Sequence, residues 1–395
     1  MKSYLLVVLA LLSGSTTLAR AESADGSGAS AVELAVVYTG DILRNTRGGL
    51  QTGGTYLDNL DVTLAVDGEA LWGVPGLELF LYGLYNNDNT FSDRYVGDDF
   101  VVSNIDTDRA IRLYEAWAQW RLNARGSATL RFGLYDLNSE FDAIDARGLF
   151  LNSTYGIGLD FSQSGENGPS IFPSTSLAMR LAWQPTENTQ LEVAVLDGVP
   201  GDPDDPAETT VRLSRDEGAL IVAEFTRNLS DSVLLSAGYW RYTADFEVLA
   251  LPPGGEPPAS QDNNQGVYLN GEVAVSDQSS VFVRGGAANG ELNHFDRYYA
   301  AGWVWRNLLP GARGDSLGIA AAAGRSSSIY RQAQAATGAP IDDYEYNAEL
   351  TWRIPAQPWL TLQPNIQFIR NPGLVPARRD ALVVGLRFEL AFAWR

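Results

Sequence analysis

Short and long connections alternate between the predicted strands of this chain. Hydrophobic and polar residues alternate with a period of two in segments of about ten residues, which is typical of β-strands with one apolar face. The short connections are 123–127, 185–188, 228–231, 276–279 and 355–357. The long connections are polar and lie at 86–108, 136–176, 197–218, 244–265 and 325–342. An up-and-down barrel of an outer membrane has short turns at one end and long loops at the other, whereas a soluble sandwich has no reason to sort its connections.

The alternating segments predict sixteen strands. They lie at 34–43, 57–67, 77–85, 109–122, 128–135, 177–184, 189–196, 219–227, 232–243, 266–275, 280–287, 298–306, 316–324, 343–353, 358–369 and 381–391. An even number of strands returns both ends of the chain to the end with the short turns. The predicted fold class is therefore all-β, a 16-stranded antiparallel transmembrane β-barrel.

The strands near the C-terminus have one polar and one apolar face. In 358–369, for example, the polar face consists of Thr361, Gln363, Asn365 and Gln367. A membrane barrel turns such faces to its lumen, but a soluble sheet can also alternate, so alternation alone leaves both folds open. Aromatic residues near strand ends favour the membrane barrel, because interfacial girdles lie there. These residues are Trp120, Trp183, Tyr239, Trp303, Trp305, Tyr346 and Trp352.

The first 21 residues have the features of a secretory signal peptide. Lys2 precedes an apolar run from Leu5 to Leu12, and Ala19 and Ala21 provide a small-x-small cleavage site. The apolar run is far shorter than the ~20 residues that a spanning helix needs. We therefore expect residues 1–21 to be removed and residues 22–395 to form a single barrel domain in the bacterial outer membrane.

The composition excludes several classes of function. The formal net charge of −20 argues against nucleic-acid binding, because an acidic surface repels phosphate. With no cysteine and one histidine, His294, neither a zinc or iron site nor a histidine-dependent triad is expected. Paired carboxylates such as Asp142 and Asp145 leave glycan hydrolysis as an alternative class, but we expect no enzyme and no cofactor. The acids of the loops serve solvation or, alternatively, bind Ca²⁺ against an anionic lipid surface.

Charged residues of both signs fall on the predicted lumen face. The acids are Asp61, Glu115, Glu192, Glu224, Glu272, Glu349 and Glu389, and the bases are Arg131, Arg180, Arg284 and Arg387. Such mixed charge suits polyhydroxylated solutes, whereas an anion pore would need rings of Arg or Lys. Glu115 and Trp117 lie on the strand before Arg131 and Tyr135, and aromatic rings beside charged groups are what a hexose site needs. The alternative is that the inward Arg and Glu residues pair with each other only to stabilise the barrel.

Several long blocks of the sequence resemble those of a known family. The central block is GLYDLNSEF at 133–141, followed by FLNSTYGIGLDFSQSGENGPSIFP at 150–173. Further blocks lie at 41–49, 113–117, 309–318, 358–373 and 381–387. Together these blocks resemble the carbohydrate-selective porin family of outer-membrane barrels. The resemblance covers nearly the whole chain after the signal peptide. It implies a sixteen-stranded barrel, narrowed by loops that fold inward, through which glucose and related sugars diffuse passively.

The resemblance also implies where the pore is narrowest. We expect 136–176 to be the main constriction loop, and Arg109, which has the same sequence parity as Glu115, to be a pore arginine. The candidate solute contacts are Arg109, Glu115, Trp117, Arg131, Tyr135, Arg180 and Glu192. The alternative function is a general, size-limited diffusion porin without sugar selectivity.

The expected partners follow from the same resemblance. They are mono- or oligosaccharide solutes, outer-membrane lipid and lipopolysaccharide, and the barrel-assembly machinery. The last is expected because 385–395 looks like a C-terminal assembly signal, although here Arg395 follows the terminal aromatic Trp394. A homo-oligomer is compatible with this fold.

Overall fold

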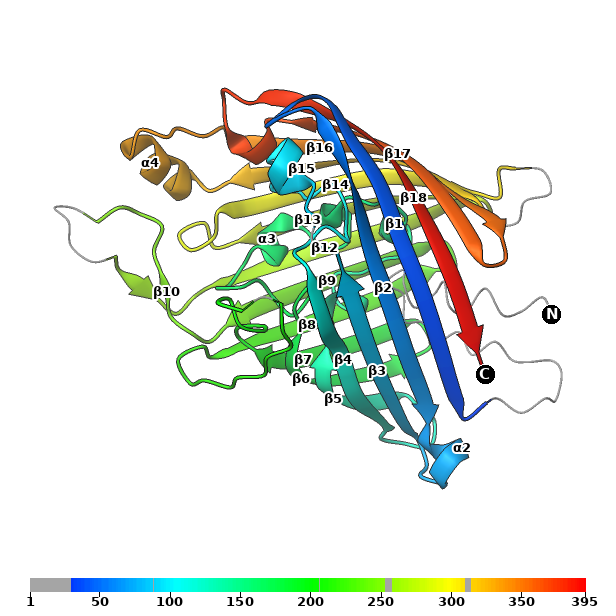
Figure 1. Ribbon diagram of the computed structural model, residues 1–395. Helices are drawn as coiled ribbons and strands as arrows, with labels where there is room; N and C mark the ends of the chain where they lie inside the picture. Colours follow the sequence, from blue (N-terminus) through cyan, green and yellow to red (C-terminus); the bar gives the residue numbers. More distant parts are fainter. Residues whose placement is uncertain (1–29, 88, 206, 253–257, 310–313) are drawn as a thin grey trace.

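Sixteen strands of the described chain form a closed antiparallel barrel (Figure 1). The computed structural model describes residues 30–395 except 88, 206, 253–257 and 310–313. The predicted signal peptide, 1–21, lies outside the described residues. The barrel strands are β1 (Val32–Gly49), β2 (Gly53–Asp67), β3 (Leu77–Asn86), β4 (Ala110–Arg121), β5 (Ala128–Tyr135), β6 (Ser176–Thr186), β7 (Thr189–Asp197), β8 (Ala219–Ser230), β9 (Val233–Tyr242), β12 (Gln265–Ser276), β13 (Ser279–Ala288), β14 (Phe295–Arg306), β15 (Ser316–Ser326), β16 (Tyr344–Gln357), β17 (Leu360–Arg370) and β18 (Arg379–Trp394). The predicted fold class is confirmed.

The barrel closes where β1 pairs with β18 in an antiparallel ladder. Asp41 and Arg387 are partners in this ladder, and their side chains form a buried ion pair with the Arg387 Nε and Asp41 Oδ1 atoms 2.7 Å apart. Arg395, which follows the terminal aromatic residue, forms a second ion pair across the same seam, with its Nε 3.0 Å from Glu33 Oε2. The unusual last residue therefore contributes to closure.

Barrel strands whose sequence alternates cleanly, such as β17, turn the polar face inward and the apolar face outward, as the alternation predicts. On β17, Gln363 and Gln367 are buried inside the barrel, whereas Ile366 is 47% exposed on the outer surface. Exposed tryptophans lie toward the turn end of the strands and exposed tyrosines toward the loop end. The tryptophans are Trp120, Trp183 and Trp303, and the tyrosines are Tyr239, Tyr299 and Tyr346. Two rings of amphipathic aromatic side chains are the arrangement expected where a barrel meets both membrane interfaces.

The connections differ in detail from the predicted alternation. β1 begins and β18 ends at the end of the barrel that carries α2 (Gly68–Trp72), opposite to α4 (Ser328–Ala336) (Figure 1). Several connections break the rule: 50–52 and 289–294 are short although they lie at the loop end, and 68–76 and 307–315 are longer than the other turns. The 243–264 loop contains a small hairpin, β10 (Phe246–Glu247) with β11 (Ser260–Gln261), which the sequence analysis missed. No helix in the described ranges is long and apolar enough to cross a membrane.

Two long loops fold into the barrel and pack against its inner wall. The first, 87–109, contains η1 (Ser92–Val96), and the second, 136–175, contains η2 (Leu137–Ser139), η3 (Arg147–Leu149), η4 (Ser153–Tyr155) and α3 (Leu159–Ser162). A further short helix, η6 (Pro372–Leu374), lies between β17 and β18. The two loops are joined by backbone hydrogen bonds from Asn104 to Leu151 (2.8 Å) and from Ser153 to Val101 (2.9 Å).

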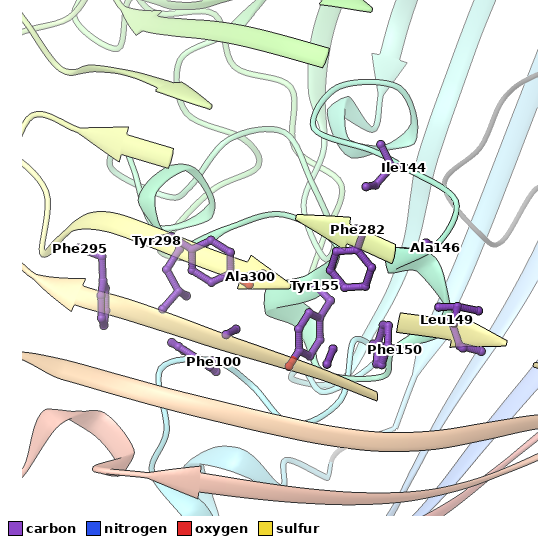
Figure 2. Packing of buried hydrophobic residues seen from close by; sticks show 14 of the residues in the cluster. Phe100, Ile144, Ala146, Leu149, Phe150, Tyr155, Phe282, Phe295, Tyr298 and Ala300 are labelled. Carbon is purple, nitrogen blue, oxygen red and sulfur yellow. The ribbon is translucent and has the colours of Figure 1, made fainter. Parts of the chain in front are cut away.

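Apolar side chains attach the second loop to the wall formed by β13, β14 and β15. Figure 2 shows Phe150 and Tyr155 of the loop beside Phe282 of β13, within one buried cluster. The Phe150 and Tyr155 ring centroids are 4.9 Å apart. Gly318 of β15 permits this approach, because a Cβ atom there would lie 2.7 Å from side-chain atoms of both Leu149 and Phe150. This side of the lumen is therefore filled, and open space is left elsewhere.

Candidate solute pore

Two arginines of adjacent strands, Arg131 on β5 and Arg180 on β6, occupy the inner wall and are ladder partners. Glu140 of the second loop pairs with both of them: its Oε1 is 2.6 Å from Arg180 Nη2 and 3.4 Å from Arg131 Nη2. The Gln119 Oε1 atom accepts hydrogen bonds from the same two guanidinium groups, at 3.0 Å from Arg131 Nη2 and 2.9 Å from Arg180 Nη2. Both arginines are therefore fully engaged with the protein, and they hold the start of the loop to the wall.

The predicted aromatic and charged cluster around Arg131 is assembled in the structure. The Arg131 guanidinium lies 3.9 Å from the centroid of the Trp117 ring and 5.2 Å from that of Tyr135. The Trp117 indole Nε1 donates to Glu115 Oε2 at 3.0 Å. The ring of Phe80 on β3 stacks on Trp117 with centroids 5.0 Å apart. Cation–π contacts of this kind fix the guanidinium plane against the wall.

A β-bulge in β4 makes one sequence expectation wrong. In the ladder with β3, Tyr82 pairs with Glu115 but the next residue, Gly83, pairs with Leu113, so β4 has one extra residue there. The bulge reverses the parity of the strand, and Arg109 is exposed instead of sharing the inner face of Glu115. Arg112 takes the inward position, and its Nη1 donates to Ser174 Oγ at 2.6 Å and to the carbonyl oxygen of Pro173. Sequence parity alone cannot locate such a bulge.

Arg284 on β13 anchors the middle of the second loop. Its side chain is completely buried and pairs with two loop carboxylates, Asp142 (Nη2 to Oδ2, 2.8 Å) and Asp160. Arg147 also pairs with Asp142, with its Nη2 3.0 Å from Oδ1. Burial alone would raise the pKa of the Asp142 carboxyl, but Arg284 and Arg147 hold it below its usual range. An acid that is so buried and so strongly paired is a poor proton donor for the hydrolysis considered as an alternative.

Carboxylates of the wall also hold the loop backbone. Glu349 of β16 accepts the backbone N–H groups of Leu151 (2.8 Å) and Asn152 (3.0 Å). Glu224 of β8 accepts the N–H of Asp142 at 2.8 Å. Several of the inward charges predicted to line the lumen therefore act as loop anchors, which is the structural alternative considered from the sequence. The sequence does not show which wall carboxylates bind the loop, because this depends on where the loop packs inside the barrel.

The larger cavity, of about 460 Å³, lies between the two inward loops and the wall formed by β1 to β4 and β18. Aromatic rings and carboxylates dominate the strand side of this cavity. The wall residues that line it include Thr39, Asn59, Asp61, Tyr82, Tyr114, Glu115, Arg387 and Glu389, and Asp136 at the start of the second loop also lines it. Tyr82 donates to Asp61 Oδ1 at 2.7 Å, and Tyr114 donates to Asp136 Oδ2 at 2.8 Å. Rings with oriented carboxylates beside them can cover the C–H face of a sugar and bind its hydroxyl groups.

Asp136, the first residue after β5, belongs to this cavity. Burial raises the pKa of its carboxyl to about 6, while hydrogen bonds from Tyr114 and from the backbone N–H of Asn138 act in the opposite direction. Glu140, four residues later, behaves differently. Burial acts to raise its pKa, but Arg131 and Arg180 hold the pKa below the usual range. The loop therefore presents one acid with a raised pKa and one with a lowered pKa, four residues apart.

A smaller cavity, of about 310 Å³, lies between the 139–145 segment of the loop and the turn end of β7, β8, β9 and β12. We call it the turn-side cavity. Ser139, Ala143 and Ile144 line both cavities, so this segment separates them. Of the seven predicted contacts, Glu115 lines the larger cavity and Glu192 the turn-side cavity. Trp117, Arg131, Tyr135 and Arg180 line neither, and form the packed cluster between them.

Comparison with known proteins identifies the family. The model of the carbohydrate-selective porin, OprB family, matches residues 51–392. The chain belongs to this family. Porin B of Pseudomonas aeruginosa is 22% identical to this porin over 90% of the chain and 86% of the relative. The predicted family and the predicted function as a sugar-selective porin of the bacterial outer membrane are thereby confirmed.

Solved structures support the fold of the porin. The high-pH structure of Pseudomonas putida OprB superposes with a TM-score of 0.81 at 20% identity, covering 92% of this chain and 94% of that one. The outer-membrane channel DcaP of Acinetobacter baumannii has a TM-score of 0.54 at 13% identity, covering 91% and 97%. The family is one of channels and not of enzymes, and its solutes are carbohydrates.

Proposed function

We propose that this porin lets glucose and related sugars diffuse passively across the outer membrane, and that the larger cavity is the part of the path that selects them. The observation that carries the proposal is the lining of that cavity. Tyr82 and Tyr114 lie edge to face with ring centroids 5.0 Å apart, and Phe172 of the loop lies 6.3 Å from Tyr114. Asp61, Glu115 and Asp136 stand beside these rings. Three rings and three carboxylates around one cavity suit a neutral ring with many hydroxyl groups.

The predicted contacts other than Glu192, which lines the turn-side cavity, take different roles in this proposal. Glu115 contacts the sugar directly, and Trp117, Arg131, Tyr135 and Arg180 keep the wall and the loop in place behind it. Arg109 has no role, because it is exposed outside the cavity. Loop 136–175 is the main constriction, since it separates the two cavities and is attached to the wall through Arg131, Arg180 and Arg284. The pore has no energy coupling, and we expect no hydrolysis of the sugars that pass.

Liposome swelling and single-channel recording test the proposal together. Glucose should enter protein-containing liposomes faster than amino acids of similar mass, and it should block the single-channel current progressively with concentration. Equal flux of sugars and amino acids would instead support a general, size-limited pore. A pore that ignores sugars but is blocked by phosphate would overturn the proposal. Release of shorter sugars from oligosaccharides would overturn the expectation that the porin is not an enzyme.

We also propose how the porin reaches its membrane. Residues 1–21 are cleaved on export, and residues 22–395 then fold as one barrel domain with the help of the barrel-assembly machinery. Lipid and lipopolysaccharide cover the outer apolar face, on which side chains such as Ile319 (51% exposed) and Leu269 (64% exposed) lie. N-terminal sequencing of the mature protein tests the cleavage site, and light scattering in detergent tests whether it is a homo-oligomer.

A further inference from the structure

The charged residues that line the turn-side cavity are all acidic. They are Glu140, Asp145, Glu192, Glu224, Asp231 and Glu272, and no Lys, Arg or His lines the cavity among the described residues. Glu140 is paired with Arg131 and Arg180 of the inner wall. Arg306 approaches Glu272 only at the edge, with its Nη2 3.9 Å from Glu272 Oε1. The lining that the structure describes therefore contributes acidic groups and no basic one.

Two of these acids face each other directly. Glu192 of β7 and Glu224 of β8 are ladder partners on the inner face of the barrel. Glu224 is well satisfied, since its Oε2 accepts the Tyr268 hydroxyl at 2.5 Å and its Oε1 accepts the Thr226 hydroxyl at 3.0 Å. Like charges directly opposite each other on a sheet are unfavourable unless a proton or a cation compensates one of them.

Glu192 is the acid with an unpaired oxygen. Its side chain is only 4% exposed and has Gln190 and the charge of Arg180 beside it, but its Oε1 atom has no hydrogen-bond partner among the described residues. Leaving an acceptor of a buried carboxylate unpaired is costly, so an N–H donor entering the cavity would find a strong partner. This orphaned oxygen belongs to a side chain that lines the cavity, which makes it an observation independent of the acidic lining.

The rest of the lining indicates what kind of cation fits. Ala143, Ile144, Val233 and Leu234 supply an aliphatic side, and Gln190, Thr226 and Asn228 supply neutral polar groups. No three Asp, Glu, His or Cys side chains in the described part of the chain lie in a position to hold a metal ion. A volume of about 310 Å³ is that of a small-molecule site. An ammonium group on a small polar body matches this lining better than a chelated metal.

We propose that the turn-side cavity is a binding site for protonated amines of sugar size, that is, amino sugars, with Glu192 as the principal partner of the ammonium group. This rests on the proposed function as a sugar pore and adds a charge preference to it. A solute that has passed the larger cavity reaches the 139–145 segment and meets the carboxylates beyond it. The ammonium group donates to Glu192 Oε1 and lies between Glu192 and Glu224, while its hydroxyl groups contact the neutral polar side chains.

The test compares three neutral or charged forms of the same ring in planar bilayers. Glucosamine, glucose and N-acetylglucosamine are titrated against the single-channel current of the full-length porin. Glucosamine should block at roughly tenfold lower concentration than either neutral sugar, because a hydrogen bond between charged groups is worth about that factor or more. Equal affinity for glucosamine and N-acetylglucosamine overturns the proposal without any variant. If glucose also has no effect, the proposed sugar function fails instead, so the two failures are distinguishable.

Two variants with the same change of charge then locate the site. Glu192→Gln should reduce the affinity for glucosamine roughly tenfold more than it reduces the affinity for glucose. Glu187→Gln is the matched control, because Glu187 is exposed in the turn after β6 and does not line the cavity. It should not alter either titration. Loss of glucosamine preference in both variants, or in neither, overturns the assignment to Glu192. A preference for inorganic cations without one for glucosamine overturns the choice of an amine.

Discussion

Arg131 and Arg180 face each other across the ladder between β5 and β6, and one loop carboxylate, Glu140, pairs with both. Two like charges at opposed positions would repel each other in the low dielectric of a barrel wall. The carboxylate of Glu140 compensates both guanidinium charges, and these two ion pairs attach the loop to the wall. The relationship links the strand register to the position of the constriction loop, and therefore to the size of the pore.

The first prediction concerns this carboxylate. Glu140→Gln removes its charge with little change of shape and leaves two buried guanidinium groups facing each other. We expect the free energy of unfolding to fall by about 3 kcal/mol, the lower end of the cost of breaking a buried ion pair. Urea unfolding in lipid vesicles, followed by tryptophan fluorescence, measures it. Glu208→Gln, in an exposed part of the 198–218 loop, is the control and should change stability little. Equal stability of both variants would contradict the role given to Glu140.

The second prediction uses two neighbouring glycines of β13. A Cβ atom at Gly286 would collide with Asp160 Oδ2 and Arg284 Nη1, whereas at Gly285 the nearest heavy atom would be Tyr299 Cδ1 at 3.8 Å. Gly286→Ala should therefore displace α3 from the wall, raise single-channel conductance and cost about 1–3 kcal/mol through overpacking. Gly285→Ala is the matched control, with the same change one residue away. Identical conductance for the two variants would show that the Arg284 anchor does not determine the pore size.

The barrel itself could be predicted from the sequence because its pattern is local. In β17, alternate residues form the polar face and the apolar face that carries Ile366. The separation of short turns from long loops indicates at which end of the barrel each strand begins. The sequence of β3, LELFLYGLY at 77–85, has no clean alternation of polar and apolar residues. Its inward face carries Phe80, which stacks on Trp117, and Tyr82, which contacts Tyr114 edge to face. An apolar inward face looks like an outward one until its partners are known.

The site could be predicted only in part, because its details depend on long-range contacts. The cluster of Glu115, Trp117, Arg131 and Tyr135 was predictable, since neighbouring strands bring it together. The prediction that Arg109 shares the inner face of Glu115 was wrong, because a β-bulge changes the parity of the strand and has no distinctive residue pattern. Glu140 was missed because nothing in a loop sequence shows which wall charges it will meet. The residues that line a pore are thus hardest to predict from sequence where a loop packs against the barrel wall.

The third prediction tests the rings of the larger cavity. Tyr82→Ala and Tyr114→Ala each remove one aromatic face next to a carboxylate. Since an aromatic contact is worth about 0.5–1.5 kcal/mol, each variant should weaken the block of the current by glucose roughly 2- to 12-fold. Tyr299→Ala, which removes a tyrosine that is 50% exposed on the outer face, is the control and should leave the glucose titration unchanged. If the Tyr299 variant alone weakened the block, the sugar would not be bound in this cavity.

The last prediction concerns pH and the first inward loop. Asp98 lies buried in that loop, and burial, with smaller contributions from Asp106 and Asp99, raises the pKa of its carboxyl to about 7. Asp99 donates its backbone N–H to Glu345 of β16 at 3.1 Å, so Asp98 is also close to the carboxylate of Glu345. The pKa of Asp98 in the folded protein is thus above the ordinary value of about 3.9 in an unfolded chain. The protonated form favours the folded state, and this contribution is lost as the pH rises from about 4 through about 7.

We therefore expect the wild-type porin to lose stability between pH 5 and pH 8, and Asp98→Asn, which stays neutral, to lose less. At pH 8 the variant should exceed the wild type by at least about 1 kcal/mol, because each unit of pKa difference corresponds to roughly 1.4 kcal/mol. Urea unfolding at a series of pH values measures this difference. Asp93→Asn, at an exposed position of the same loop, should follow the wild-type curve. Parallel curves for the wild type and the Asp98 variant would show that the carboxyl of Asp98 is ionised in the folded barrel at no cost, and that the first loop is not held by its protonated form.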